Sequence, residues 1–152
     1  MILFLHWLGF AVWLGGGMTF MVWGPLTKQA PLPAWAHTWE TLGKVQQWIV
    51  APACAVATVT GVVLSMQYAQ RPGASMGATW LVLMQVLGLL AGVLTLAIAT
   101  PLANRMAYLA LSSVEKGEKD PRADRVRGRL ALVSSVSGAM ILVTLYFAAN
   151  HI

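Results

Sequence analysis

The chain opens with the apolar stretch Leu5-His6-Trp7-Leu8-Gly9-Phe10-Ala11-Val12-Trp13-Leu14-Gly15-Gly16-Gly17, which contains one histidine and no charged residue. At the 3.6-residue period of an α-helix, one face of this stretch carries His6, Gly9, Trp13 and Gly16. The histidine then looks along a groove floored by glycines and flanked by aromatic rings. A flat cofactor would fit such a groove, so these four residues are the predicted cofactor-binding set.

Similar apolar stretches recur through the 152-residue chain. Hydrophobic residues make up 58% of it and charged residues 10%, whereas a soluble domain carries roughly a quarter charged residues. A helix needs about 20 apolar residues to cross the hydrocarbon core of a bilayer, and the segments are too long and too continuously apolar for barrel strands. We expect an all-α integral membrane four-helix bundle in one domain, 1–152, with helices over 2–23, 45–68, 79–102 and 121–150.

Small and polar residues predict how these helices pack. The second helix carries Pro52, which favours a local irregularity, and a stripe of small residues. The third contains the pair Gly88 and Gly92, whose spacing marks close helix packing. The partner helix lies either within the chain, which we favour, or in a second copy of it, so a homodimer is possible. Asp120 and Pro121 form an N-cap and a first-turn proline, which starts the fourth helix there.

Orientation follows from the ten basic residues. The connection 103–129 holds seven of them, and the loop after the first helix holds Lys28 and Lys44. The loop after the second helix holds only Arg71. The positive-inside rule therefore places both termini on the outer, periplasmic side of a bacterial inner membrane, with 103–129 as a basic cytoplasmic loop. The net charge of +5 is explained by orientation and anionic lipid headgroups, and we expect no nucleic-acid partner.

This topology brings two histidines to the same side of the membrane. His6 is near the start of the first helix and His151 near the end of the fourth, and these two helices are commonly neighbours in a closed bundle. Neutral imidazole is a ligand for haem iron, copper and zinc. Methionine thioethers, which suit Cu(I) and haem iron, occur on the same half. The predicted metal ligands are therefore His6, His151, Met84 and Met66, against the simpler reading of interfacial histidines and packing methionines. His37 is read as an interfacial loop histidine.

Several enzyme classes find no support in the sequence. The spans contain no carboxylate pair, the chain has no Gly-rich phosphate loop after a strand, and a nucleophilic triad cannot be assembled around Cys54. A proton-coupled transporter usually needs an ionisable residue at mid-depth, which is missing here. We predict no catalytic residue.

Two stretches resemble a known family. The pattern from Leu5-His6-Trp7-Leu8-Gly9 to Trp13-Leu14-Gly15-Gly16 is similar to the first helix of the copper-resistance D superfamily, which includes the HemJ-type membrane protoporphyrinogen oxidase. The stretch from Val45 to Gly61 resembles its second helix. The resemblance implies a haem b or copper site with His6 in the ligand position. The oxidase type carries a lysine after a tryptophan in its third helix, whereas here Trp80 is followed by Gln85, which argues against protoporphyrinogen oxidation.

Three functions remain open at this point. The leading prediction is a haem b-binding membrane protein that acts in electron transfer or as a small subunit of a membrane redox complex. The second is a copper-handling membrane protein that uses His6 and methionines. The third is a structural or assembly subunit without a cofactor, for which the small-residue stripes are sufficient explanation.

Overall fold

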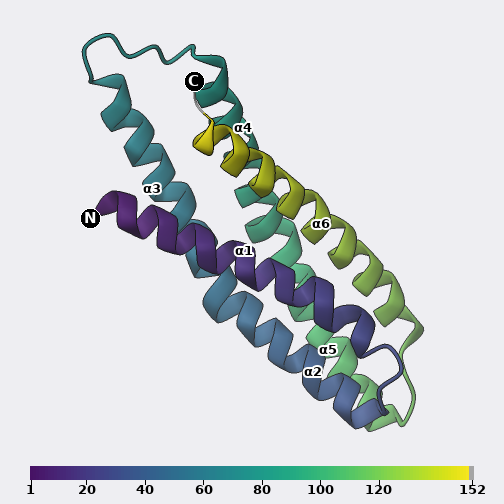
Figure 1. Ribbon diagram of the computed structural model, residues 1–152. Coiled ribbons are helices and arrows are strands. Elements are labelled where there is room, and N and C mark those ends of the chain that lie inside the picture. The colour runs from purple at the N-terminus through teal and green to yellow at the C-terminus, as the bar shows by residue number, and fades with distance from the viewer. Residues whose placement is uncertain (151–152) are drawn as a thin grey trace.

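The computed structural model describes residues 1–150, and helices occupy most of this range (Figure 1). The elements are α1 (Ile2–Leu26), α2 (Leu32–Val45), η1 (Gln46–Val50), α3 (Ala51–Ala69), α4 (Thr79–Val93), η2 (Leu94–Ala99), α5 (Thr100–Lys116) and α6 (Pro121–Ala149), where η marks a π-helical segment. The segments α2, η1 and α3 run on without a break, as do α4, η2 and α5. The chain therefore folds into four long helices, and residues 1–150 contain no strand, which confirms the predicted all-α class.

Each of the four helices is long and apolar enough to cross a membrane: Ile2–Leu26, Leu32–Ala69, Thr79–Lys116 and Pro121–Ala149. Many of their large apolar side chains are exposed on the outside of the bundle, among them Val59, Leu89 and Leu142. Because burying these side chains in lipid is favourable and exposing them to water is not, the fold is that of a multi-pass membrane protein.

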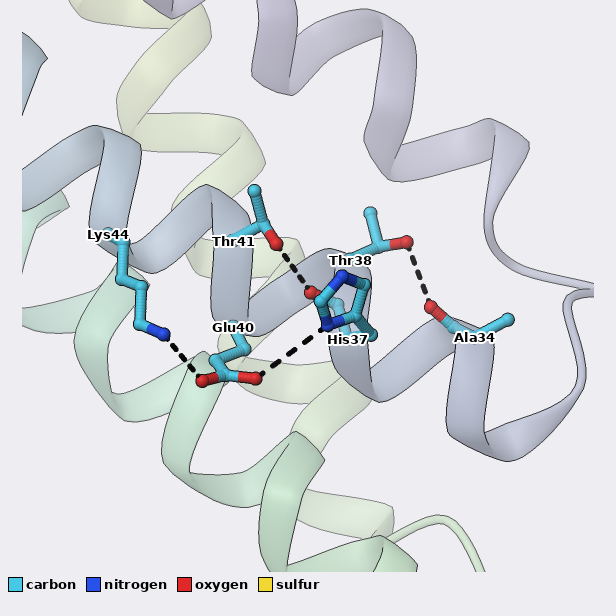
Figure 2. A network of polar contacts seen from close by, with 6 residues as sticks. All are labelled: Ala34, His37, Thr38, Glu40, Thr41 and Lys44. Carbon is cyan, nitrogen blue, oxygen red and sulfur yellow. Dashed lines mark hydrogen bonds and ion pairs between the residues drawn. The ribbon is translucent and has the colours of Figure 1, made fainter.

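Two helices extend further than the apolar segments. The second begins at Leu32, before the predicted segment 45–68, and the third continues to Lys116, beyond 102. Pro31 and Pro33 stand at the start of α2, where a missing N–H costs nothing. The polar residues of α2 face outward, and Glu40 accepts a hydrogen bond from Lys44 at 2.7 Å and pairs with His37 at 3.9 Å (Figure 2).

The two ends of the bundle differ. Loops 27–31 and 117–120 lie at one end, which we call the basic end, and the loop 70–78 lies at the opposite end, which we call the terminal end because α1 starts and α6 finishes toward it (Figure 1). At the basic end Lys119 Nζ donates to the carbonyl of Lys28 at 3.1 Å and lies 5.3 Å from the ring centre of Trp35. These contacts tie the two loops together. The carboxylate of Asp120 caps α6 by accepting from the backbone N–H of Arg122 at 2.8 Å.

The packing is tightest at glycines. A Cβ on Gly9 would lie 2.9 Å from the carbonyl oxygen of Ala53 and 3.0 Å from the backbone nitrogen of Ala57. A Cβ on Gly16 would overlap Val50. A Cβ on Gly92 would lie 2.8 Å from the hydroxyl oxygen of Thr58. These glycines let α1 and α4 approach the second long helix closely, so the in-chain partner predicted for the Gly88 and Gly92 stripe is found for Gly92.

The buried side chains form two clusters. The larger joins α1, α2, α5 and α6 toward the basic end and includes Trp35, Trp39 and Met106. The smaller lies at mid-bundle around Trp13, Cys54 and Ile141. Toward the terminal end, among the described residues, the helices are not joined by such a cluster, and the site described below lies there.

Both π-helical segments end just before a proline. The backbone N–H of Ala51 bonds to the carbonyl of Gln46, and that of Thr100 to the carbonyl of Thr95, each five residues back, and Pro52 and Pro101 follow. A proline ring clashes with the carbonyl four residues before it, and the wider π turn relieves that clash. The irregularity expected at Pro52 is therefore a π turn, and a second one precedes Pro101.

Replacing Gly9 by alanine tests the close approach of α1 and α3. The added methyl group meets backbone atoms of α3, which cannot move aside as a flexible side chain would. We expect Gly9→Ala to lower the free energy of unfolding by about 1–3 kcal/mol, the usual cost of overpacking. Unfolding of the purified protein in detergent measures it.

Gly15→Ala is the matched control, because a Cβ on Gly15 meets nothing within 4 Å. Equal stability of the two variants would contradict the packing argument.

Candidate functional site

A cavity of about 570 Å³ lies at the terminal end of the bundle. Its walls come from α1, α3, α4 and α6 and from the loop after α3, and they are mostly apolar. Aromatic rings make up much of the wall, namely Trp7, Phe10, Trp13, Tyr68 and Trp80. The volume falls within the range of about 300–1,000 Å³ that small-molecule and cofactor sites occupy. It is therefore large enough for a flat organic cofactor.

His6 lines this cavity, and its ring is held by α3. The Nδ1 atom lies 2.9 Å from the carbonyl oxygen of Ala57 and 3.2 Å from the hydroxyl of Thr60. Gly61 makes room for the ring, since a Cβ there would lie 3.1 Å from Cε1 of His6. The imidazole is thus fixed by a backbone acceptor, a hydroxyl and a glycine that come from one turn of α3.

The contact with Ala57 fixes the tautomer of His6. A carbonyl oxygen only accepts hydrogen bonds, so Nδ1 carries the hydrogen and donates it. In a neutral imidazole the lone pair is then on Nε2. Within residues 1–150, no group forms a hydrogen bond with Nε2. Metal-binding histidines characteristically donate from their other nitrogen to a carbonyl or carboxylate, so His6 has the arrangement of a ligand.

Both predicted methionine ligands line the same cavity. Met66 comes from α3 and Met84 from α4, and Met76 from the connecting loop joins them. Gln85 and Gly88 are also in the wall. A Cβ on Gly88 meets nothing within 4 Å, so a larger side chain there would project into open space. The cavity therefore combines one imidazole, three thioethers and an amide in an apolar surround.

The remaining predicted residues are placed differently. Trp13 lines the cavity, but its Nε1 is committed to the hydroxyl of Thr95 at 3.1 Å. Gly9 and Gly16 are outside the cavity wall and pack against α3 and η1. His151 lies outside the described residues. His37 lies on α2 toward the basic end and outside the wall of this cavity, and its side chain is 82% exposed.

The described part of the chain brings together no group of three or more His, Cys, Asp or Glu residues that could hold a metal ion. A metal bound by these residues would thus rely on the single imidazole with thioether ligands, or on a macrocycle that supplies most of the ligands itself.

Sequence reasoning missed the residues that orient His6. The acceptor on Ala57 is a backbone carbonyl, which leaves no trace in the side-chain pattern. Gly61 entered the sequence analysis only as the end of the stretch that resembles the second helix of a known family, without a role beside His6. The role of these residues becomes visible once α1 and α3 are placed side by side.

The tautomer of His6 is directly measurable. We expect ¹⁵N-histidine labelling of the cofactor-free protein, at a pH where the ring is neutral, to show the hydrogen of His6 on Nδ1, because the Ala57 carbonyl holds it there. NMR shifts of the two ring nitrogens distinguish the tautomers. The signal should disappear in His6→Gln and persist in His37→Gln. A hydrogen on Nε2 of His6 would overturn the orientation.

The chain was compared with known proteins in three ways. No family model, curated protein or solved structure matches it. The geometry of the cavity is therefore what supports a function.

Proposed function

We propose that the protein binds haem b in the cavity beside His6 and acts in electron transfer or as a small subunit of a membrane redox complex. The observation that carries this proposal is the hydrogen bond from Nδ1 of His6 to the carbonyl of Ala57, which leaves the Nε2 lone pair without a partner among the described residues. A lone pair of this kind on a cavity wall would suit a ligand of haem iron.

The residues present fit a haem group. The wall is apolar and aromatic, as the faces of a porphyrin require, and the cavity has the volume of a cofactor site. Met66 and Met84 offer thioethers that could serve as a further ligand of the iron, alongside His151 from the sequence. Arg71 follows α3 at the cavity end of the bundle and is exposed, so it is available to the carboxylates of a porphyrin. The bound iron would supply one-electron redox chemistry.

The charge distribution supports the orientation in a bacterial inner membrane. Arg71 is the basic residue of the terminal-end loop 70–78, whereas the other lysines and arginines follow α1 or α5 or belong to α2, α5 and the first turns of α6. By the positive-inside rule the basic end faces the cytoplasm and the cavity lies in the periplasmic half.

The optical spectrum of the purified protein tests haem binding. We expect a Soret band, either as isolated or after adding haem, and a loss of haem affinity of more than tenfold in His6→Ala. Losing an outer partner of a metal ligand already costs about 10–100-fold. Gly61→Ala should weaken binding about tenfold by pressing on the His6 ring.

Matched variants separate a lost site from a lost fold. Gly88→Leu fills the cavity and should abolish binding, whereas Gly15→Leu meets no neighbour and should retain it, as should His37→Ala. A wild-type protein that elutes as a folded species but shows no Soret band with added haem would end the haem proposal and leave copper handling or a structural or assembly role.

Copper handling is the second candidate, because Met66, Met76 and Met84 line the cavity with His6. Thioethers and imidazole together suit Cu(I). If this function is the correct one, metal analysis should find copper without haem. The double variant Met66→Leu and Met84→Leu should then lower the Cu(I) affinity at least about tenfold, since two soft ligands are lost. Met18→Leu is the control and should leave the affinity unchanged, because Met18 lines the second cavity and not the cavity of His6.

A further inference from the structure

A second cavity, of about 220 Å³, lies deeper in the bundle, between α1, the two π-helical segments and α6. Trp13 lines both cavities and so stands between them. The wall of the second cavity contains no Asp, Glu, Lys, Arg or His, although it includes Gln46 and several serines of α6. Any molecule held there must be uncharged, because nothing in the wall would balance a charge.

The orientation of the Gln46 amide follows from a chain of hydrogen bonds. The hydroxyl of Thr100 donates its one hydrogen to the carbonyl of Thr95 at 2.9 Å. It therefore accepts at its contact with Gln46, whose Nε2 lies 3.0 Å away. Nε2 is thus the atom that faces Thr100, and the amide oxygen, Oε1, faces away from it.

Gln46 Oε1 is an acceptor without a donor. Gln46 is only 4% exposed, and it lines the second cavity. Within residues 1–150 no group donates to Oε1, and the hydroxyl of Ser134 in the same wall has no partner either. Oε1 is not sealed inside the packing, because among the described residues the only fully buried side-chain polar atom without a partner is Nε1 of Trp39. The cavity beside it is the space from which a partner can reach it.

The rim of this cavity faces lipid. Met18 and Met21 of α1 and Leu142 of α6 line it, and each is close to half exposed on the outside of a helix that is apolar enough to span a membrane. In a membrane these side chains would lie against lipid chains, so a molecule dissolved in the bilayer would approach the cavity between α1 and α6.

We propose that the second cavity binds an uncharged, lipid-soluble molecule of the phenol or alcohol class. Its O–H donates to Oε1 of Gln46, its oxygen accepts from Ser134, and its apolar body lies against α1 and α6. The volume suits a single ring, being below the range of about 300–1,000 Å³ for larger ligands. This site is separate from the cavity of His6 and stands whether or not haem binds there.

A pair of probes, a phenol and its methyl ether, in which a methyl group replaces the donated hydrogen, tests the proposal. Binding of 4-(trifluoromethyl)phenol and of 4-(trifluoromethyl)anisole to the full chain in phospholipid nanodiscs is measured by ¹⁹F NMR, with empty nanodiscs giving the lipid background. We expect the phenol to bind about tenfold more tightly than the anisole, because a tenfold ratio of affinities corresponds to the free energy of roughly one buried hydrogen bond.

Variants of the wall locate the probe. Gly17 lines the second cavity and a Cβ there meets nothing within 4 Å, so Gly17→Leu fills it and should abolish specific binding. Gly15→Leu, whose Cβ also meets nothing, should bind as the wild type does. Gln46→Met keeps the side-chain length and should remove the preference for the phenol. Because Gln46 also bonds to Thr100, Ser134→Ala provides a milder change, with a smaller loss of the same preference.

Three results would overturn the proposal. Equal affinities for phenol and anisole would show that no hydrogen bond is made. Loss of binding in Gly88→Leu but not in Gly17→Leu would place the probe in the cavity of His6. Phenol binding that stays at the empty-nanodisc background would assign the second cavity to water or lipid chains.

Discussion

The close contact of α1 with α3 is the constraint on which the other features depend. In lipid, helices gain little by hiding apolar surface from one another, so association relies on intimate packing and on hydrogen bonds between helices. Gly9 removes the side chain that would otherwise hold the backbones apart. The same approach carries His6 to the carbonyl of Ala57. One packing contact thus sets both the stability of the pair and the chemistry of the imidazole.

The contact also determines where space remains. With α1 held against α3, and α4 against α6, the smaller cluster around Trp13 and Cys54 closes the middle of the bundle. Toward the terminal end, side chains from these four helices surround open volume. Trp13 divides that volume from the deeper cavity and is itself fixed by Thr95.

The sequence predicted the helices well, but it did not predict which of their glycines face a cavity and which face a neighbouring helix. In lipid, a long apolar segment can pair all its backbone N–H and C=O groups only as a helix, so the segment that begins at Ile2 was predicted to be helical. Periodicity placed His6, Gly9, Trp13 and Gly16 on one face, but it does not reveal whether a glycine faces a cavity or a neighbouring backbone, which depends on tertiary contacts. The start of the second helix at Leu32 was missed because hydropathy marks the membrane-crossing part and not the amphipathic turns before it. The carbonyl of Ala57 could not be predicted as the acceptor for His6, because every residue carries a backbone carbonyl.

The two π turns affect how this sequence should be aligned with others. A π turn amounts to one extra residue within an α-helix, and each residue advances the helix by about 100°. Side chains after Val50 and after Ala99 are therefore rotated relative to those before them. A helical wheel drawn through either position would assign wrong faces to half of the helix. In an alignment with a protein whose helices are uninterrupted, a single-residue gap belongs at each π turn, and without it the small residues on either side would be compared out of phase.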